Sequence, residues 1–429
     1  MKVLVVSHNV MSRSDNMGKT LLSYFGDFKC DELAQFYIHS EMPNDKKACR
    51  NYYRFTDIDA VKSIIPFKKR GGKIPEDEIL DVNAASREEL GQLEGVYQYG
   101  RNRSGFIYLM RNLVWGLSHW FTKDLKKWLD DFKPDVVFFA AGDYAFMYKV
   151  AMKFADYAKC PLVLSCVDDY YIYNKNKATL SGKLAHRQLM KNARKTFDKA
   201  LFATAICDNM ARAYQKLFHK KCYTLYTGAD KKEGLDVLHG HQISYIGNLG
   251  YDRHLQLIDM GKALKSLGRT EEPLYIDVYS AEKNQNVLDT LTEENGIRFH
   301  GRISPDEVLK VMENSMAVIH TEAFDEDLEN QVRFSVSTKI AESLLYGPCL
   351  IAYGAKGIAS FDYLEENEAA FVISTKEELR DGIQKIVEDR ELREKIVANA
   401  RALAEKNHRS DVNAKKVRGW LEEHVTADI

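Results

Sequence analysis

The sequence predicts an α/β protein made of two doubly wound, Rossmann-like domains that face a common cleft. Short runs rich in β-branched and aromatic residues alternate with amphipathic helical stretches along the 429 residues. The runs are almost continuously apolar, which is typical of parallel strands covered by helices on both faces. The alternation stops once, in the polar and glycine-bearing segment 227–242, and then begins again. Two such domains in tandem normally bind ligands at the carboxyl ends of their strands.

The first half contains the strands and helices of one open sheet. Apolar runs predict strands at 2–8, 33–39, 135–141, 161–167, 202–206 and 222–226. Helical patterns such as 143–160 and 207–221 lie between them. Residues 62–104 interrupt this rhythm with little strand character, and a long helix is expected to begin near Phe106. A loop of this length inside a compact domain is typically functional or mobile.

The second half repeats the same alternation. Strands are predicted at 243–250, 274–280, 297–303, 316–322, 348–354 and 369–374. After them the chain is helical to its end and offers no further strand. This organisation predicts a second α/β domain of similar size.

Composition excludes several classes of protein. The formal net charge of −1 gives no global sign of nucleic-acid binding, so any basic surface is local. The seven cysteines are scattered singly without a zinc spacing, which favours reduced thiols in a cytoplasmic protein. No apolar run approaches the roughly 18 residues that a membrane span needs. We therefore expect a cytoplasmic protein that is at most attached to a membrane surface.

The first strand leads into Gly18-Lys19-Thr20, which has the form of the end of a phosphate-binding P-loop. The position where a P-loop has its first glycine is Arg13, and Asp143 lacks the usual context of a Walker-B aspartate. We therefore interpret the turn differently: Asp15 or Asn16 caps a helix whose amides face an anion, and Gly18 lets a phosphate approach. On this interpretation a side chain at Gly18 obstructs the ligand and leaves the fold intact. The alternative is an ordinary strand-to-helix turn.

The segment 245–258, "YIGNLGYDRHLQLI", combines a strand, a glycine turn and a helix. Gly247 and its neighbour Asn248 bring the backbone close to a ligand. Arg253 stands where the next helix begins, and a guanidinium there can form a bidentate bond to phosphate oxygens. The alternative is a solvated arginine on the helix surface.

The segment 333–354, "RFSVSTKIAESLLYGPCLIAYG", predicts a second anion-binding helix. Ser337 is a good N-cap for this helix, so the amides of Thr338 and Lys339 point toward an anion. Lys339 and Glu342 lie on one helix face, where the alternative is a surface ion pair. A cation for the diphosphate and a carboxylate for the ribose hydroxyls are the groups that a nucleoside diphosphate needs.

Other strand ends supply further candidates. Ser280 and Arg302 follow strands in "VYSAEK" and "FHGRIS", and such loops commonly frame a base. In the first domain His8, Asp168 and Asp169 follow strands. They are candidates for contacts with a second substrate, and each aspartate can equally be a capping residue.

Together, "YIGNLGYDR", "FHGRISPDEV", "FSVSTKIAESLLYGPCLIA" and the closing helices make the chain resemble the retaining glycosyltransferases of the GT-B fold, specifically family 4 and its capsule and exopolysaccharide members. The resemblance covers most of residues 240–425. It implies that the turn at Gly18 faces the donor diphosphate, that Arg253 and Lys339 bind that diphosphate, and that Glu342 binds the ribose. It also implies domains at 1–235 (acceptor side) and 236–410 (nucleotide sugar), with a helix at 411–429 that returns to the first domain.

The resemblance implies a metal-independent reaction with no cofactor. Charge develops on the leaving diphosphate, and fixed cations such as Arg253 and Lys339 stabilise it. The acidic "DED" at 325–327 has the form of a metal motif of another glycosyltransferase fold, and we interpret it as a solvated or acceptor-side loop. The chain departs from the family at Phe334, where a glutamate is expected. Glu322, or the hydroxyls of Ser335 and Ser337, can replace that carboxylate.

We therefore expect a glycosyltransferase that moves a sugar from a nucleoside-diphosphate sugar to a glycan or lipid-linked glycan, with retention, in cell-surface polysaccharide synthesis. A nucleotide-sugar epimerase or phosphorylase on the same scaffold, or a binding protein without turnover, are the alternatives. The basic, aromatic stretch 101–128, with Arg101, Arg103, Arg111, Trp115, Trp120, Lys126, Lys127 and Trp128, suits an anionic membrane surface or core packing, and we favour core packing.

Overall fold

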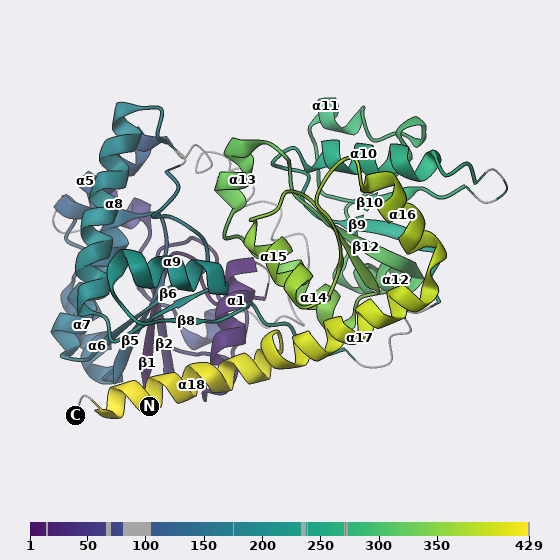
Figure 1. The fold of residues 1–429 in the computed structure, drawn as a ribbon. Helices are drawn as coiled ribbons and strands as arrows, with labels where there is room; N and C mark the ends of the chain where they lie inside the picture. Colours follow the sequence, from purple (N-terminus) through teal and green to yellow (C-terminus); the bar gives the residue numbers. More distant parts are fainter. Residues whose placement is uncertain are drawn as a thin grey trace. The chain divides into compact units, whose positions relative to one another are not determined.

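The structure, a computed structural model, describes residues 1–13, 16–65, 70–79, 104–174, 176–232, 237, 239–269, 271 and 273–427. The chain divides into two compact units, drawn in Figure 1. Unit 1 comprises Met1–Tyr226 and Asn413–Ile429, and unit 2 comprises Thr227–Val412. The sequence placed the two divisions at 235/236 and 410/411. Each unit is a doubly wound α/β structure, so the predicted fold class is confirmed.

Unit 1 is built on a sheet with the strand order β4-β3-β2-β1-β5-β6-β7-β8. Its strands are β1 (Val3–Ser7), β2 (Leu33–Tyr37), β3 (Tyr52–Arg54), β4 (Gly72–Lys73), β5 (Val136–Ala141), β6 (Leu162–Cys166), β7 (Ala203–Ala205) and β8 (Cys222–Thr224). Neighbouring strands are parallel except for the antiparallel pair β3 and β4. Sequence patterns missed β3 and β4 because both are too short to form an apolar run, and β4 lies inside the segment expected to lack strands.

Unit 1 contains the following described helices, four of which begin at a side-chain cap. They are α1 (Asn16–Phe25), α2 (Asp57–Ser63), α5 (Gly105–Leu117), α6 (Lys123–Phe132), α7 (Ala145–Ala158), α8 (Leu180–Lys199), α9 (Asp208–Phe218) and α18 (Ser410–Ala427). The side chains of Thr56, Ser104, Thr122 and Thr179 accept backbone hydrogen bonds at the starts of α2, α5, α6 and α8. Such caps satisfy amides that the first helical turn leaves unpaired.

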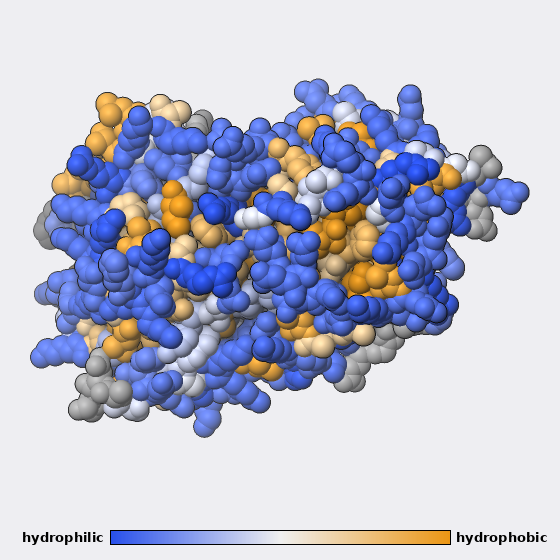
Figure 2. Space-filling view, in the orientation of Figure 1, coloured by the Kyte–Doolittle hydropathy of each residue, from blue (hydrophilic) through white to orange (hydrophobic). Residues whose placement is uncertain are grey.

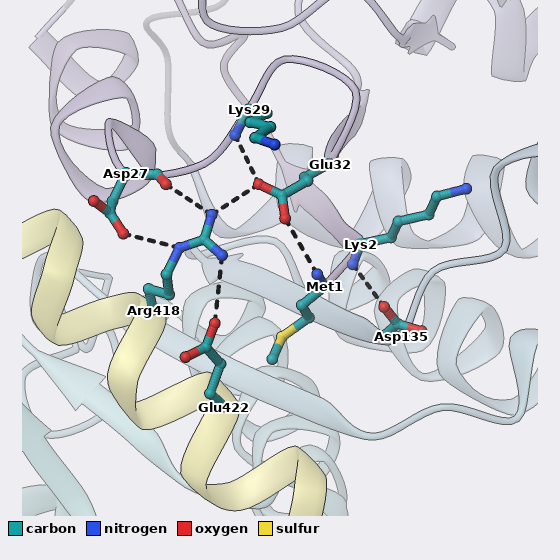
Figure 3. A network of polar contacts seen from close by, with 8 residues as sticks. All are labelled: Met1, Lys2, Asp27, Lys29, Glu32, Asp135, Arg418 and Glu422. Carbon is teal, nitrogen blue, oxygen red and sulfur yellow. Dashed lines mark hydrogen bonds and ion pairs between the residues drawn. The ribbon is translucent and has the colours of Figure 1, made fainter.

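The last helix, α18, belongs to unit 1 from Asn413 onward, and it runs beside α1 (Figure 1). Val417, Leu421 and Val425, spaced at helical intervals, are buried in the same core as β1. Arg418 adds a polar network, shown in Figure 3. Its guanidinium contacts the Asp27 carboxylate at 2.9 Å and the Glu32 carboxylate at 2.8 Å. The segment is therefore attached by both apolar burial and ion pairs.

Unit 2 is built on a parallel sheet with the order β11-β10-β9-β12-β13-β14. Its strands are β9 (Gln242–Ile246), β10 (Ile276–Tyr279), β11 (Ile297–Gly301), β12 (Ser315–Thr321), β13 (Cys349–Tyr353) and β14 (Phe371–Ile373). Its helices are α10 (Arg253–Lys265), α11 (Gln285–Leu288), α12 (Pro305–Asn314), α13 (Glu326–Val332), α14 (Thr338–Tyr346), α15 (Ala359–Glu366), α16 (Leu379–Glu388) and α17 (Arg390–Asn407).

The order of the strands reverses next to the first strand of each sheet. In unit 2 the chain builds β9, β10 and β11 in one direction and then continues with β12 on the other side of β9. In unit 1 the equivalent reversal lies between β1 and β5. Ligands of open α/β sheets bind at the carboxyl edge beside such a reversal, because the loops of the two adjacent strands diverge there. These two positions are therefore the first places to look for function.

Candidate functional site

The carboxyl edge of the unit 2 sheet gathers most of the predicted donor residues. Arg302 follows β11, Ser280 follows β10, Gly247 and Asn248 follow β9, and Glu322 follows β12. These strands are neighbours in the sheet and all run in the same direction. The residues therefore lie along one edge, with the reversal between β9 and β12 in their midst.

Arg253 and Glu322 form a bidentate ion pair at this reversal. Arg253 begins α10, and its Nε and Nη2 atoms donate to the two Glu322 carboxylate oxygens at 2.9 Å and 2.8 Å. This fork is the preferred geometry between guanidinium and carboxylate. Glu322 is buried, and burial raises the pKa of its carboxyl group, while Arg253 opposes that rise. The arginine that was predicted to contact phosphate is thus held in place by a carboxylate.

Lys339 meets the same loop from α14. The Ser337 hydroxyl accepts a hydrogen bond from the Lys339 amide at 3.4 Å and caps the helix, as predicted. The Lys339 ammonium donates to the Ile246 carbonyl at 2.6 Å. Although the residue as a whole is exposed, partial removal of its ammonium from water lowers the Lys339 pKa to about 8; Glu342 opposes this and Arg253 adds to it. Two cations therefore converge on the end of β9.

The loop after β9 has a fixed backbone. A Cβ atom at Gly247 would lie 2.7 Å from the Tyr245 hydroxyl, which itself donates to the Asn248 carbonyl at 2.6 Å. Gly247 is therefore required by the packing of Tyr245, whereas the sequence suggested only close approach of a ligand. Tyr251 and Asp252 have φ angles of 59° and 55°, in the left-handed region. Such residues cost of order 1 kcal/mol each and are typical of functional loops.

The remaining predicted donor residues lie in different surroundings. Glu342 is half-buried one turn beyond Lys339 on α14, beside Tyr346. Thr338 is the first residue of α14, so its amide faces the same side as the Ser337 cap. Ser280 is buried, and its amide donates to the Gly301 carbonyl at 2.9 Å. Arg302 is exposed.

Two residues of unit 2 that sequence reasoning missed support this arrangement. Arg401 on α17 donates from Nη1 to the Leu344 carbonyl at 2.7 Å and from Nη2 to the Gly347 carbonyl at 2.6 Å. It thereby satisfies carbonyls at the end of α14, and burial lowers its pKa to about 10. His320 in β12 is buried and hydrogen-bonded to Ser360 at 3.0 Å, and burial lowers its pKa to about 3. Single residues without a motif gave no signal in the sequence.

The position where the family pattern has its first glutamate is occupied by a core residue. Phe334 is buried, and so is Val336 two residues later. Glu322, one of the proposed replacements, is the buried glutamate of the described residues, and it faces Arg253. Ser337, another of them, caps α14. The structure thus makes Glu322 the partner that orients the Arg253 guanidinium.

Gly18 in unit 1 has a different surrounding from the one expected. A Cβ atom there would lie 2.7 Å from the Ser12 carbonyl oxygen and 2.8 Å from the Val10 carbonyl oxygen. Both contacts are with backbone, so the turn after β1 cannot yield without moving the chain. The prediction that a side chain at Gly18 leaves the fold intact is therefore wrong. Asp15 and the side chain of Asn16, the proposed caps, lie outside the described residues.

The acceptor-side candidates lie at the carboxyl edge of the unit 1 sheet. The His8 ring, after β1, is centred 5.0 Å from the Tyr144 ring, after β5, so the two straddle the reversal. Asp169 is buried, and it accepts hydrogen bonds from the Tyr173 amide at 2.9 Å and the Tyr214 hydroxyl at 2.8 Å. Asp168 accepts from the Asp169 amide at 2.9 Å. These bonds give Asp169 the capping role that was the alternative to substrate binding.

The structure also places described residues of two other stretches, the basic, aromatic stretch 101–128 and the acidic "DED" at 325–327. Trp115 and Trp128 are buried, as core packing predicts, while Arg101 and Arg103 lie outside the described residues. Asp325, in the acidic "DED", caps α13 by accepting from the Leu328 amide at 3.0 Å. Within the described parts of the chain, no group of three or more His, Cys, Asp or Glu side chains is arranged to hold a metal ion.

Comparisons with known proteins agree with this fold. Residues 261–419 match the glycosyl transferase-like family, a segment that contains Lys339 and Glu342. A comparison with curated protein sequences gives no match.

Solved structures resemble the whole chain. HepE of Anabaena, in complex with UDP and glucose, is 13% identical with a TM-score of 0.61, covering 99% of this chain and 100% of HepE. Sucrose-phosphate synthase of Thermosynechococcus elongatus is 11% identical with a TM-score of 0.61 and full coverage of both chains, 100% each. WaaG, a glycosyltransferase involved in lipopolysaccharide biosynthesis, is 12% identical with a TM-score of 0.54, covering 97% and 98%. The chain thus has the two-domain fold of these solved structures, and its residues 261–419 are similar to the glycosyl transferase-like family.

Proposed function

We propose that this protein is a retaining, metal-independent glycosyltransferase that uses a nucleoside-diphosphate sugar. The observation that carries the proposal is the convergence of Arg253 and Lys339 on the end of β9, at the reversal of the unit 2 sheet. A diphosphate has two anionic groups, and two cations on either side of one short loop are complementary to it. The acceptor is a glycan or lipid-linked glycan, in the synthesis of a cell-surface polysaccharide on the cytoplasmic side of the membrane.

The chemistry requires stabilisation of the leaving group. The bond from the anomeric carbon to the diphosphate oxygen breaks, the acceptor oxygen bonds to that carbon, and the proton of the acceptor hydroxyl passes to the leaving diphosphate. Negative charge grows on the diphosphate as the sugar acquires oxocarbenium character. Arg253 and Lys339 supply fixed positive charge at those oxygens, with Glu322 orienting the guanidinium. Glu342 is assigned to the ribose hydroxyls.

Three further findings support the proposal. The glycosyl transferase-like match covers α14 and most of unit 2. HepE, whose fold the chain shares, was solved with UDP-glucose bound. The motifs around Arg253 and Lys339 resemble those of family 4 glycosyltransferases, and retention of configuration follows from that resemblance.

The proposal is tested by donor turnover. The chain is incubated with a panel of UDP- and GDP-sugars without acceptor, and release of the nucleoside diphosphate is measured. Slow release from one donor is expected, and Lys339→Ala should reduce it about a hundredfold or more, as loss of one transition-state donor does. Lys385→Ala, on the exposed face of α16, is the matched control and should leave release unchanged.

The alternatives give different outcomes in the same experiment. If a donor binds and no nucleoside diphosphate is released, the chain is a nucleotide-sugar binding protein. This outcome is included because Phe334 stands where the family has a glutamate. Interconversion of two sugars assigns it to the epimerases. Glu342→Ala should weaken donor binding about tenfold, as loss of a hydrogen bond from a charged group does, and unchanged affinity overturns the ribose assignment.

A further inference from the structure

Helix α5 exposes an apolar stripe. Phe106, Met110, Leu113 and Leu117 are 42% to 62% exposed. Their spacing of four, three and four residues places them on one face of the helix. Trp115, on the opposite face, is buried. Helix α5 therefore has apolar side chains on the face turned to solvent as well as on the face turned to the core.

Helix α2 extends the stripe on one side. It is joined to α5 by an ion pair of 2.8 Å between Arg111 and Asp57 and by a hydrogen bond of 3.1 Å from the His119 amide to the Ser63 hydroxyl. The exposed apolar side chains of α2 and the residues after it are Ile58, Val61, Ile64 and Ile65. Because the two helices are in contact, their exposed apolar residues lie on adjacent elements.

Helix α8 extends it on the other side. Gly105 of α5 and Gly182 of α8 approach so closely that a Cβ at Gly105 would overlap the Gly182 backbone, and the Asn112 amide donates to Gln188 at 2.9 Å. Leu180 and Leu184 of α8 are exposed. Figure 2 shows apolar side chains gathered at the corner of unit 1 where Figure 1 draws α5 and α8. We call this surface the α2–α5–α8 face.

Cations border the apolar residues of the α2–α5–α8 face. A groove of about 680 Å³ between α5, α7 and α8 is lined by Lys149, Lys191 and Lys195 together with apolar side chains such as Leu113 and Phe146. None of these three lysines forms an ion pair with another described residue. Along α8 the basic residues are Lys183, Arg187, Lys191, Arg194, Lys195 and Lys199, against the single acidic residue Asp198.

The acidic residues of α2 do not offset this charge. Asp57 is paired with Arg111, and Asp59 closes the capping box with Thr56. Helix α5 has no acidic residue. The face therefore combines exposed apolar side chains with cations such as Lys191 and Lys195, which form no ion pair with another described residue, whereas Lys199 is paired with Asp156.

We infer that the α2–α5–α8 face docks on an anionic lipid bilayer. A bilayer surface offers acyl chains to the apolar side chains and phosphate groups to the lysines within the same few ångströms. A second copy of this chain would bring the α8 lysines toward cations of the same kind, which repel. None of the described helices combines the length and apolarity needed to cross a bilayer, so the contact is peripheral. This inference does not depend on the proposed activity.

The test is sedimentation of the full chain with vesicles. Phosphatidylcholine alone and an equal mixture of phosphatidylcholine and phosphatidylglycerol are compared. Binding is expected only with the mixture and should weaken as salt is added. Lys191→Ala with Lys195→Ala should weaken partition roughly 25-fold, since each lysine near an anionic surface contributes about fivefold. Lys262→Ala with Lys310→Ala, exposed on α10 and α12, is the matched control.

The apolar contribution is tested separately. Phe106→Ser with Leu113→Ser should weaken partition about tenfold, whereas Leu255→Ser, an exposed leucine of unit 2, should not change it. Absence of binding to the mixed vesicles overturns the inference, and so does equal weakening by the control variants. A dimer in solution that Phe106→Ser with Leu113→Ser dissociates would also overturn it, because the face would then belong to a second copy.

Discussion

Arg253 and Glu322 are joined by two hydrogen bonds of 2.9 Å and 2.8 Å across the point where the strand order of unit 2 reverses. One residue begins the helix after β9, and the other follows β12. The pair therefore ties together the two loops that diverge at the reversal. It leaves the Nη1 group of Arg253 directed to the Asn248 carbonyl at 3.5 Å, a long contact that a phosphate oxygen can replace.

We predict that Glu322→Gln lowers both stability and donor affinity. The change leaves a mostly buried guanidinium without its counter-charge, and we expect the free energy of unfolding to fall by about 1–3 kcal/mol. Nucleoside diphosphate affinity should also fall, because Arg253 loses its fixed orientation. Urea denaturation and titration calorimetry with UDP measure the two effects. Glu342→Gln, at a half-buried position of α14, is the comparison: it should affect affinity and leave stability nearly unchanged.

We predict that donor binding depends on pH because of Lys339. Its pKa of about 8 means that the free protein loses this charge well below the ordinary lysine value of 10.5. Affinity for UDP should therefore fall by up to tenfold for each pH unit above about 8. Lys339→Arg keeps the charge and should abolish the dependence. The same slope in both proteins would remove Lys339 from the diphosphate site.

We also predict that Lys339 contributes to the pH dependence of the free energy of unfolding. Between pH 8 and 10.5 the unfolded chain binds more protons at Lys339 than the folded chain does. Its contribution to the free energy of unfolding therefore rises with pH across that window. Comparison of urea midpoints for the natural chain and Lys339→Met at neutral and alkaline pH measures this contribution, and a fall in place of a rise contradicts it.

Gly18→Ala should destabilise unit 1 before it affects any ligand. Its Cβ would meet backbone oxygens at 2.7 Å and 2.8 Å, and overpacking of this kind costs about 1–3 kcal/mol. Gly419→Ala is the matched control, because a Cβ there, in α18, meets nothing within 4 Å. We expect that control to stabilise the helix by up to about 1 kcal/mol. Thermal unfolding of the two variants measures the difference, and equal midpoints would contradict the contact at Gly18.

Arg418→Met should weaken the attachment of α18. It should also reduce the loss of unfolding free energy that occurs as the pH falls. The hydrogen bond from Arg418 is the largest cause that lowers the Glu32 pKa to about 2. The stabilisation is present above the ordinary glutamate pKa of 4.5 and is lost as pH falls toward 2. The pair is partly exposed, so solvent screening leaves about 1 kcal/mol at neutral pH.

Urea unfolding at neutral and acid pH measures the effect of Arg418→Met. The exposed pair of Arg390 with Glu394 on α17 provides the control, and Arg390→Met should leave both the midpoint and its pH dependence unchanged. A natural chain and an Arg418→Met variant with the same acid dependence would show that the network in Figure 3 does not contribute.

The sequence by itself determined the doubly wound architecture and indicated the sheet edge at which we propose the donor site. Every predicted strand is present, because buried parallel strands need continuous apolar runs that are visible in the chain. It also placed Arg253 at the start of α10 and Ser337 at the cap of α14, because helix ends carry local signals.

Only the tertiary structure decided which side chains meet. Glu322 pairs with Arg253 from 69 positions away, and Arg401 reaches the end of α14 from another helix. Local patterns carry no record of such distances, because strand order decides which loops become neighbours. The role of Gly18 was misjudged for the same reason: its neighbours are the backbone oxygens of the preceding turn, and their approach is set by how α1 packs after β1.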